Sequence, residues 1–243
     1  MATSTPIILF PLYRWAGTTP EQFREHYIKV HSAIGKRMGV IWYETFFNSL
    51  AARDWPVFGA PVPDAFTVMM FPSAADLANV RNTEVWQQEV LKDSIGFVSH
   101  APVAEVERYT WIPEPASPTQ ANAPIVLFPI YRWAGTSVAA FREHYVHVHS
   151  EIGKRLPGVI WYESFLNKHA TDDWPVFDAP QPDAFALMKF ASRAAMADLR
   201  NSAEWTEAAK DDIGFVSHAH VIQTERVTWL ADPEVRSAYR VLC

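Results

Sequence analysis

The chain has 243 residues, of which 49% are hydrophobic and 14% aromatic, so it can bury a sizeable core in one large domain or two small ones. Its formal net charge of -6 and the scattered positions of its lysines and arginines argue against a surface that binds nucleic acid. The single cysteine, Cys243, excludes an internal disulfide framework and a thiolate metal site.

The N-terminal segment lacks the features of a secretory leader, because no basic residues precede its apolar stretch and Pro11 interrupts that stretch. Nor is any apolar run long enough to predict a membrane span. We therefore expect a soluble, cytoplasmic protein with no membrane or nucleic-acid partner.

The first predicted element is a strand at residues 7–13, IILFPLY, which form a short and nearly continuous apolar run. A helix is predicted next, because residues 19–22, TPEQ, supply an N-cap, a first-turn proline and a capping-box glutamine. Apolar residues recur along this helix at helical spacing, and Gly35 or Gly39 could end it.

Two histidines flank the apolar face of this helix. At about 100° per residue, His26 and His31 fall on opposite sides of the stripe that begins at Phe23. Histidines four residues apart on a helix can share one metal ion, but an angle of about 140° between His26 and His31 does not allow this. We therefore expect no metal site from the histidines of this helix alone.

Two more strands are predicted at residues 40–50 and 64–71, with a proline-rich loop between them. Ser73 is expected to cap a second helical stretch that is bent near Asn82. A strand at about residues 102–111 follows. The order strand, helix, strand, strand, helix, strand is the ferredoxin-like pattern.

The whole pattern then occurs a second time. Residues 7–18, IILFPLYRWAGT, recur as IVLFPIYRWAGT at 125–136, and REHYIKVH at 24–31 recurs as REHYVHVH at 142–149. All ten tryptophans fall into matched pairs. The chain is therefore a tandem duplication.

A segment rich in proline and polar residues, 112–124, separates the two copies and has the composition of a linker. We place the boundary near Thr119, which gives a first repeat of residues 1–118 and a second repeat of residues 119–243. Each is expected to form one ferredoxin-like domain.

The strand at residues 40–50 is apolar on both faces, with Tyr43 on one face and Trp42 on the other. Helices cover only one face of a ferredoxin-like sheet, so the other face needs a cover. We predict an α+β fold in which two tandem ferredoxin-like (βαββαβ) repeats pack sheet to sheet into one closed barrel with the helices outside. Two separate domains would leave this apolar face exposed.

Three histidines of the first repeat have a counterpart in the second. The pairs are His26 with His144, His31 with His149, and His100 with His218. A single pair could be a hydrogen-bonded part of the duplicated core, but three pairs together favour a functional role. Imidazole titrates near neutral pH and suits general acid–base catalysis in a chain without a useful thiol.

Other paired residues allow two interpretations each. Tyr43 and Tyr162 stand on the second strand of each repeat, where their phenols could meet a histidine or be buried with a satisfied hydroxyl group. Trp55 and Trp174 lie in the proline-rich loops and could cover a binding pocket or pack over a barrel end.

Arg14 and Arg132 end a strand and could bind a substrate anion or pair with a carboxylate. Asp64 and Asp183 open the third strand of each repeat, where the simplest role is a cap at the end of a loop. Two further aspartates precede the recurring IGF segment and could terminate a helix; these are Asp93 and Asp212.

Residues 141–163, FREHYVHVHSEIGKRLPGVIWYE, followed by PDAFALMKF at 182–190 and IGFVSHA at 213–219, resemble the EthD-like branch of the dimeric α+β barrel superfamily, in tandem form. Family members usually dimerise to close a barrel, so the resemblance implies an intramolecular dimeric α+β barrel. Relatives include a muconolactone methylisomerase, polyketide cyclases, decarboxylases and cofactor-free monooxygenases.

The resemblance also implies site residues. A helix histidine and a strand tyrosine are functional in the methylisomerase, and these roles fall on His149 and Tyr162, and in the first repeat on His31 and Tyr43. The cysteine of that isomerase has no counterpart in this chain. The turn after the helix differs between the repeats, so the two pockets need not be equally competent.

No nucleotide, flavin, zinc or serine-nucleophile motif is present, so we expect no cofactor and no metal. The leading hypothesis is a cofactor-independent lyase or isomerase that uses histidine and tyrosine for acid–base chemistry on a hydrophobic oxygenated small molecule, either aromatic or a lactone. Two alternatives are a cofactor-free monooxygenase of phenols and a non-catalytic protein that binds a small ligand or haem. A homo-oligomer of the duplicated chain is a further expectation.

Overall fold

The computed structural model describes residues 5–50, 62–116, 123–170 and 181–233. The chain divides into two compact units, and in these units the two repeats have exchanged their last strand segments. Unit 1 consists of Met1–Glu105 with Glu225–Cys243, and unit 2 consists of Val106–Thr224. Each unit therefore contains most of one repeat together with the last strand segment of the other. The repeat boundary near Thr119 lies outside the described residues and stays a proposal.

The sheet of unit 1 is built from the strands of the first repeat and the end of the chain. Its strands are β1 (Ile7–Arg14), β2 (Trp42–Asn48), β3 (Ala65–Met70), β4 (Val98–His100) and the Glu225–Leu230 part of β10 (Ile222–Leu230). Strand β3 pairs antiparallel with both β1 and β2, and β4 pairs with β1. Strand β10 lies beside β2.

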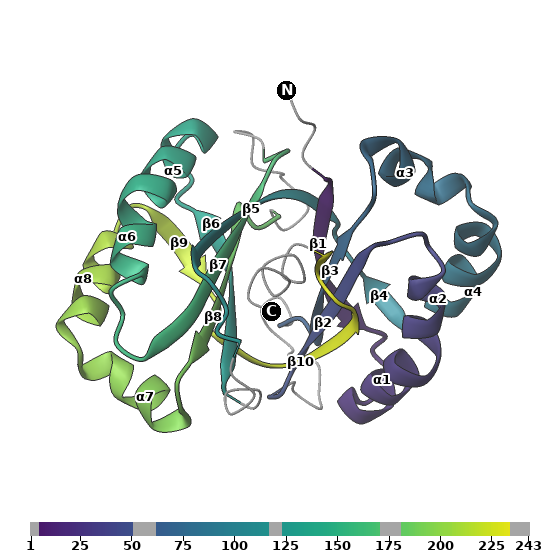
Figure 1. The fold of residues 1–243 in the computed structure, drawn as a ribbon, viewed down its shortest axis with the longest axis horizontal. Helices are drawn as coiled ribbons and strands as arrows, with labels where there is room; N and C mark the ends of the chain where they lie inside the picture. The colour runs from purple at the N-terminus through teal and green to yellow at the C-terminus, as the bar shows by residue number, and fades with distance from the viewer. Residues whose placement is uncertain (1–4, 51–61, 117–122, 171–180, 234–243) are drawn as a thin grey trace. The chain divides into compact units, whose positions relative to one another are not determined.

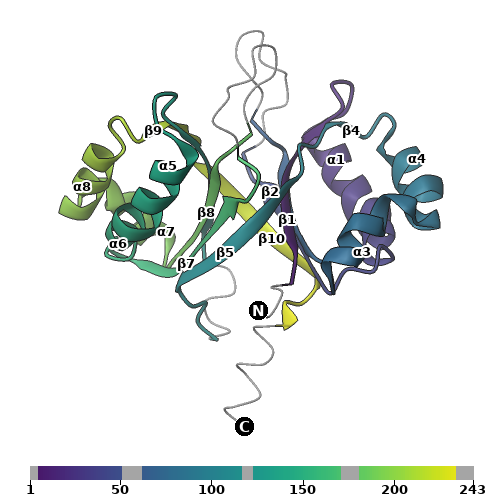
Figure 2. The same cartoon turned by 90° about the horizontal axis from the view of Figure 1, so that it is seen from above.

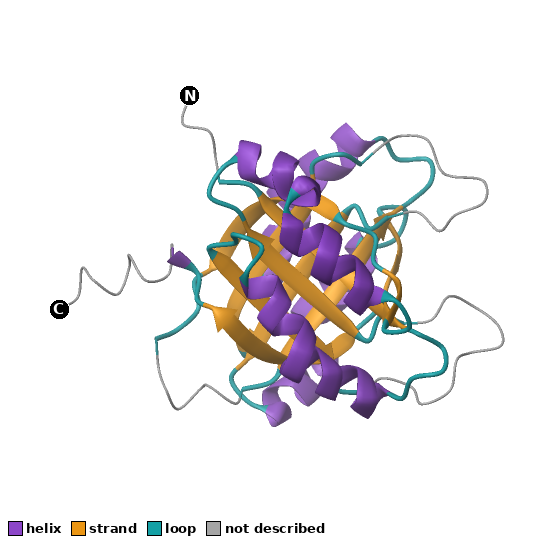
Figure 3. Ribbon diagram, turned by 90° about the vertical axis from the view of Figure 1, so that its right-hand side faces the viewer, coloured by secondary structure: helices purple, strands orange, loops and turns teal. Residues whose placement is uncertain are grey.

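Helical segments cover one face of this sheet (Figure 1). They are α1 (Pro20–His26), the π-helical turn η1 (Tyr27–His31), α2 (Ser32–Lys36), α3 (Ala74–Asn79), the 3₁₀ turn η2 (Val80–Asn82), the π-helical segment η3 (Val85–Val90) and α4 (Leu91–Ser94). Figure 3 shows them lying across the strands. The predicted capping box is present, with Thr19 and Gln22 each accepting from the other's backbone N–H.

Unit 2 repeats this arrangement with the strands of the second repeat and the last strand of the first. Its strands are β5 (Ala104–Ile112, of which Val106–Ile112 belong to unit 2), β6 (Ile125–Arg132), β7 (Val159–Asn167), β8 (Ala184–Phe190), β9 (Val216–Ala219) and the Ile222–Thr224 part of β10. Strand β5 pairs antiparallel with β7, and β8 lies between β7 and β6.

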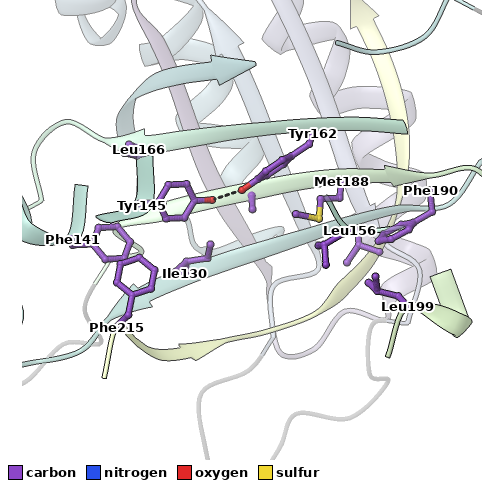
Figure 4. Close-up of a cluster of buried hydrophobic side chains, with 13 residues drawn as sticks. Ile130, Phe141, Tyr145, Leu156, Tyr162, Leu166, Met188, Phe190, Leu199 and Phe215 are labelled. Carbon is purple, nitrogen blue, oxygen red and sulfur yellow. Dashed lines mark hydrogen bonds between the residues drawn. The ribbon is translucent and has the colours of Figure 1, made fainter. Parts of the chain in front are cut away.

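The helices of unit 2 lie on one side of β7 and β8 (Figure 2). They are α5 (Val138–His144), the π-helical turn η5 (Tyr145–His149), α6 (Ser150–Gly153), α7 (Arg193–Asp198), the 3₁₀ turn η6 (Leu199–Asn201) and α8 (Ala203–Asp211). Side chains from the helices and the sheet form one buried cluster, shown in Figure 4. Burial of this face is what holds the helices on the sheet.

The predicted order of long elements is confirmed in both units. Two features differ from the sequence prediction. The VSHA segments form the short strands β4 and β9, and a π-helical turn interrupts the helix that carries the paired histidines. Among the described residues no helix has the length and apolar character needed to cross a membrane.

Candidate functional site

Two histidines and one aspartate form a hydrogen-bonded bridge in unit 1. Nε2 of His26 lies 2.7 Å from Oδ1 of Asp93, and Nδ1 of His31 lies 2.7 Å from Oδ2 of the same carboxylate. The carboxylate thus joins α4 to both ends of the π-helical turn. Phe97 packs against both imidazoles, with ring centroids 4.4 and 5.1 Å away.

The same bridge occurs in unit 2 at the corresponding positions. Nε2 of His144 lies 2.8 Å from Oδ1 of Asp211, and Nδ1 of His149 lies 2.9 Å from Oδ2. Phe215 takes the place of Phe97 against the two rings. Because both repeats keep the arrangement, the four histidines are positioned by the fold itself.

The prediction that His26 and His31 lie on opposite sides of their helix was wrong, because it assumed a regular α-helix. A π-helical turn has more residues per turn and closes i to i+5 hydrogen bonds, which brings residues five apart onto one side. Both rings then reach the same carboxylate. Among the described residues, no group of three or more histidine, cysteine or carboxylate side chains is arranged to hold a metal ion.

The bridging carboxylates stay ionised at neutral pH. Burial acts to raise the pKa of Asp211, but hydrogen bonds from His149 and His144 outweigh burial and lower that pKa below its usual value. Asp93 follows the same pattern with His31 and His26. An ionised carboxylate held at Nδ1 stabilises a protonated imidazole and leaves Nε2 of the neutral ring as the proton acceptor.

Beside each bridge lies a pair of buried tyrosines. In unit 1 the hydroxyl of Tyr27 lies 2.8 Å from the hydroxyl of Tyr43 and 2.8 Å from Oγ1 of Thr67. Thr45 donates to the Tyr27 hydroxyl at 3.0 Å, and Nε1 of Trp229 donates to Thr45 at 3.0 Å. Of the two interpretations left open for Tyr43, burial with a satisfied hydroxyl group is the one that the structure has.

The tyrosine pair of unit 2 is looser. The hydroxyls of Tyr145 and Tyr162 lie 3.4 Å apart, as the dashed line in Figure 4 shows. Tyr145 also lies 2.9 Å from Oγ of Ser164, which accepts from Nε1 of Trp111. Burial is the main cause that raises the pKa of Tyr162, so its phenol stays protonated and able to donate.

A cavity of about 360 Å³ lies between the helices and the sheet of unit 2. His149, Tyr162 and Asp212 supply its main chemical groups. Most of the other lining residues are apolar and come from β6, β8, η6, α8 and the turn after α6; they include Phe128, Ile130, Leu156, Met188, Leu199, Trp205 and Ala208. The size and lining suit a small hydrophobic molecule.

Asp212 is a site residue that the sequence analysis did not single out for function. Its Oδ1 lies 3.7 Å from Nδ1 of His149, and its side chain is 45% exposed. Burial raises its pKa, His149 acts in the opposite direction, and the charge of Asp211 raises it further. Asp212 is therefore the carboxyl group of this site that holds a proton most readily.

Comparison with known families identifies this part of the chain. Residues 134–219 match the family model described as EthD domain. The chain contains an EthD domain. The matched residues include His149, Tyr162 and Asp212 of the cavity lining. No curated protein sequence matches the chain.

Solved structures share the fold at low sequence identity. An anthrone oxidase-like protein is 10% identical over 94% of both chains, with a TM-score of 0.60. A candidate monooxygenase from Fusobacterium nucleatum subsp. nucleatum ATCC 25586 is 8% identical over 93% of this chain and 94% of its own, with a TM-score of 0.57. Another from Lactobacillus acidophilus NCFM is 13% identical over 92% and 94%, with a TM-score of 0.50. At these identities the likenesses show a shared fold alone.

The two paired arginines are structural. Arg14 forms a buried ion pair with Asp64, donates its backbone N–H to the same carboxylate at 2.9 Å, and donates Nε–H to the carbonyl of Thr18 at 2.7 Å. Arg132 forms the equivalent ion pair and backbone hydrogen bond with Asp183, and donates Nε–H to the carbonyl of Thr136 at 2.9 Å. Pairing with a carboxylate, one of the two interpretations left open by the sequence, is what the structure has.

Of the remaining predicted residues, His100 lies outside both the bridge and the cavity. His100 is exposed on β4, and its ring lies 5.6 Å from that of Tyr13. The backbone of His218 pairs with that of Tyr131 in β9, and its side chain lies outside the described part of the structure. Trp55 and Trp174 also lie outside the described residues, so their proposed role in covering a pocket stays a prediction.

Unit 1 has a smaller pocket at a different place. It has a volume of about 240 Å³ and lies between the start of α1 and the end of β2. Its lining includes Phe47 and Arg24, which pairs with Glu225 at 2.6 Å and lies 4.6 Å above the Phe47 ring. Two carboxylates of the lining are held in ion pairs, Glu225 with Arg24 and Asp64 with Arg14.

Proposed function

We propose that the EthD domain is a cofactor-independent enzyme of the lyase or isomerase type that acts on a hydrophobic oxygenated small molecule, aromatic or a lactone. One observation carries the proposal. An imidazole, a phenol and a carboxyl group, from His149, Tyr162 and Asp212, line one mostly apolar cavity. Enzymes that move protons without a cofactor need such groups at a dry, shaped site.

His149 is the proposed base. Asp211 holds its Nδ1, so Nε2 is the ring nitrogen left for a substrate proton. After Nε2 takes up a proton, the imidazolium is stabilised by the ionised Asp211 and by the charge of any carboxylate formed at Asp212. General acid–base catalysis of this kind contributes about 10²- to 10⁴-fold to a rate.

Tyr162 and Asp212 supply protons. The C–H bond of the substrate breaks, its proton goes to His149, and the electron pair moves into an adjoining carbonyl group. The Tyr162 phenol stabilises the oxygen that gains this charge. Asp212, which is part exposed and exchanges with water, gives its proton to the atom that receives the electron pair. The product has the atoms of the substrate, with one proton moved.

Oxygenation is the second candidate, because the names of three neighbours on the same fold refer to monooxygenases or to an anthrone oxidase-like protein. It begins with the same proton transfer to His149. The substrate carbanion then gives its electrons to O₂, so that a CH₂ group and O₂ become a carbonyl group and water. No further reductant is needed.

Anthrone, an aromatic ketone with an acidic CH₂ group, tests both candidates. Under nitrogen in D₂O, we expect the protein to speed deuterium exchange at the CH₂ carbon, and His149→Ala to lower the rate on the order of 100-fold. His31→Ala, the matched change in unit 1, should leave the rate unchanged. In air, O₂ uptake matched by anthraquinone formation would establish oxygenation.

Wild-type exchange no faster than the buffer rate would rule out proton abstraction from this probe and with it the proposed function. Equal rates in the His149→Ala and wild-type proteins would assign any catalysis to another group. Circular dichroism and thermal unfolding of each variant show whether a lost rate reflects lost folding.

A further inference from the structure

The two repeats keep the same bridge and tyrosines, and three of the differences around the cavity change its space or its polar groups. The strand register identifies the first difference. Phe10 faces Thr67 across β1 and β3, and Phe128 faces Ala186 across β6 and β8. Thr67 and Ala186 are therefore equivalent, and the second repeat has lost a hydroxyl and a methyl group at this position.

This first change opens space and loosens the tyrosines. Thr67 is fully buried and holds the Tyr27 hydroxyl at 2.8 Å, whereas Ala186 lines the cavity. The distance between the two tyrosine hydroxyls increases from 2.8 Å in unit 1 to 3.4 Å in unit 2. Tyr162 is thereby left with capacity for a hydrogen bond to a ligand.

The second change lies on the helical segment before the bridging aspartate. The first repeat is one residue longer from Thr83 to Gly96 than the second is from Ser202 to Gly214. The extra residue is taken up in the π-helical segment η3, whereas α8 is a regular α-helix.

As a result, different side chains face inward at equivalent places. Three residues before Asp93 stands Val90, which is buried. Three residues before Asp211 stands Ala208, which lines the cavity. The first repeat thus has a larger buried side chain at this position than the second.

The third change adds an acid. Ser94 follows Asp93, and its hydroxyl donates to the carbonyl of Val90 at 2.8 Å. Asp212 follows Asp211 and points its carboxyl group at His149 instead. The second repeat therefore has both more room and one more proton-carrying group than the first.

We infer that duplication has left one ligand-binding repeat and one closed repeat. The chain binds one hydrophobic phenolic molecule, in the cavity of unit 2, and Thr67, Val90 and Ser94 close the equivalent place in unit 1. The inference rests on the proposed site but not on its chemistry, because it concerns where a ligand is held and how many are held.

A matched pair of tryptophans reports on the two places separately. Trp205 lines the cavity, and Trp86 is its counterpart on η3 of the first repeat. In ¹⁵N-labelled protein titrated with 2-naphthol, we expect the indole N–H resonance of Trp205 to shift to saturation and that of Trp86 to stay in place. Trp205→Phe and Trp86→Phe assign the two resonances, and calorimetry should give one bound molecule per chain.

Exchanging the three residues between the repeats completes the test. Ala186→Thr with Ala208→Val and Asp212→Ser should weaken 2-naphthol binding by about tenfold or more, since the cavity is filled. Thr67→Ala with Val90→Ala and Ser94→Asp should make the Trp86 resonance respond and raise the count towards two. If this second variant does not fold, the inference is still tested by the binding of 2-naphthol to the first variant and by the number of molecules that the wild-type chain binds.

Equal response of Trp86 and Trp205 in the wild-type protein, or no response of either, would overturn the inference. So would unchanged binding in the folded variant with the filled cavity. One bound molecule without any deuterium exchange on anthrone would keep the inference and reject the proposed function, so the two failures are distinguishable.

Discussion

At the scale of single residues, a shared carboxylate gives each paired histidine a fixed orientation. His144 and His149 bind the two oxygens of Asp211, so neither ring can rotate without breaking a hydrogen bond. Fixing the ring orientation of a base lowers the cost of reaching the geometry for proton transfer. In the second repeat an additional carboxyl group of the cavity, that of Asp212, lies near the ring of His149.

The bridges predict how stability depends on pH. The folded-state pKa of Asp93 and of Asp211 is lowered, so each contributes stability above the unfolded-state pKa of about 3.9 and loses it as pH falls through the lower folded value. We expect the free energy of unfolding to fall below about pH 4, and Asp93→Asn with Asp211→Asn to reduce that slope.

At pH 7 the double variant should be less stable by about 1–3 kcal/mol, because each histidine loses a hydrogen bond to a charged partner. Urea unfolding between pH 2 and pH 7 measures both effects. Asp198→Asn, at an exposed position of α7, is the control and should leave the slope as in the wild type. A slope unchanged in the double variant would show that the bridges do not carry the acid sensitivity.

The histidines and tyrosines of the site could be predicted from their repetition, but their partners could not. His149 and Asp211 are 62 residues apart, and no local pattern joins them. The offset of 118 between His31 and His149 also joins Asp93 to Asp211, which is the signal that identifies the bridging acid. The sequence analysis compared Asp93 with Asp212 instead and so missed Asp211. The repeats differ in length by one residue in the helical segment before these aspartates, which makes either alignment possible.

At the scale of elements, local chemistry determined what could be predicted. The capping box at Thr19 depends on residues within four positions of one another, so the start of α1 was predictable. The end of the helix was not. Gly39, with φ of +80°, ends the turn after α2. Gly35 instead stays within α2, where the absence of a side chain leaves room for the ring of Tyr43.

This close approach predicts a difference between the two repeats. A Cβ at Gly153 would lie 2.6 Å from Cε1 of Tyr162, and one at Gly35 would lie 2.7 Å from Cε1 of Tyr43. Gly153→Ala and Gly35→Ala should each destabilise the protein by about 1–3 kcal/mol, because the tyrosine must move. Thermal unfolding measures this loss.

Of the two variants, Gly153→Ala should also weaken 2-naphthol binding, because Gly153 and Tyr162 line the cavity of unit 2 and Gly35 and Tyr43 do not. The Trp205 resonance reports the change, and Gly35→Ala is the matched control. If both variants bind 2-naphthol as the wild type does, Tyr162 does not contact the ligand, and its proposed role at the substrate oxygen is lost.

At the scale of the whole molecule, each unit depends on the other repeat for its last strand segment. Repetition and the apolar character of both strand faces predicted two ferredoxin-like copies, but not this exchange, because the sequence does not record which sheet a terminal strand joins. Nε1 of Trp229, from the second repeat, donates to Thr45 of the first, and Trp111 does the same for Ser164. Packing of the two sheets into one closed barrel stays a prediction from the sequence.

The exchange predicts how the chain behaves when it is divided at Thr119. A fragment of residues 1–118 lacks the Glu225–Leu230 segment that lies beside β2, so an edge strand and the cluster around Tyr43 lose their cover. Unpaired sheet edges and apolar faces drive association. We expect this fragment to form dimers in which each copy supplies its own β5 in place of β10.

Light scattering after size-exclusion chromatography measures the mass of the fragment, and circular dichroism measures its folding. Mixing it with residues 119–243 should produce a one-to-one complex, since each fragment then receives the strand segment that it receives in the intact chain. A fragment 1–118 that is monomeric and unfolds cooperatively would show that one repeat is complete by itself. In that case strand exchange would add contacts without being required for either sheet.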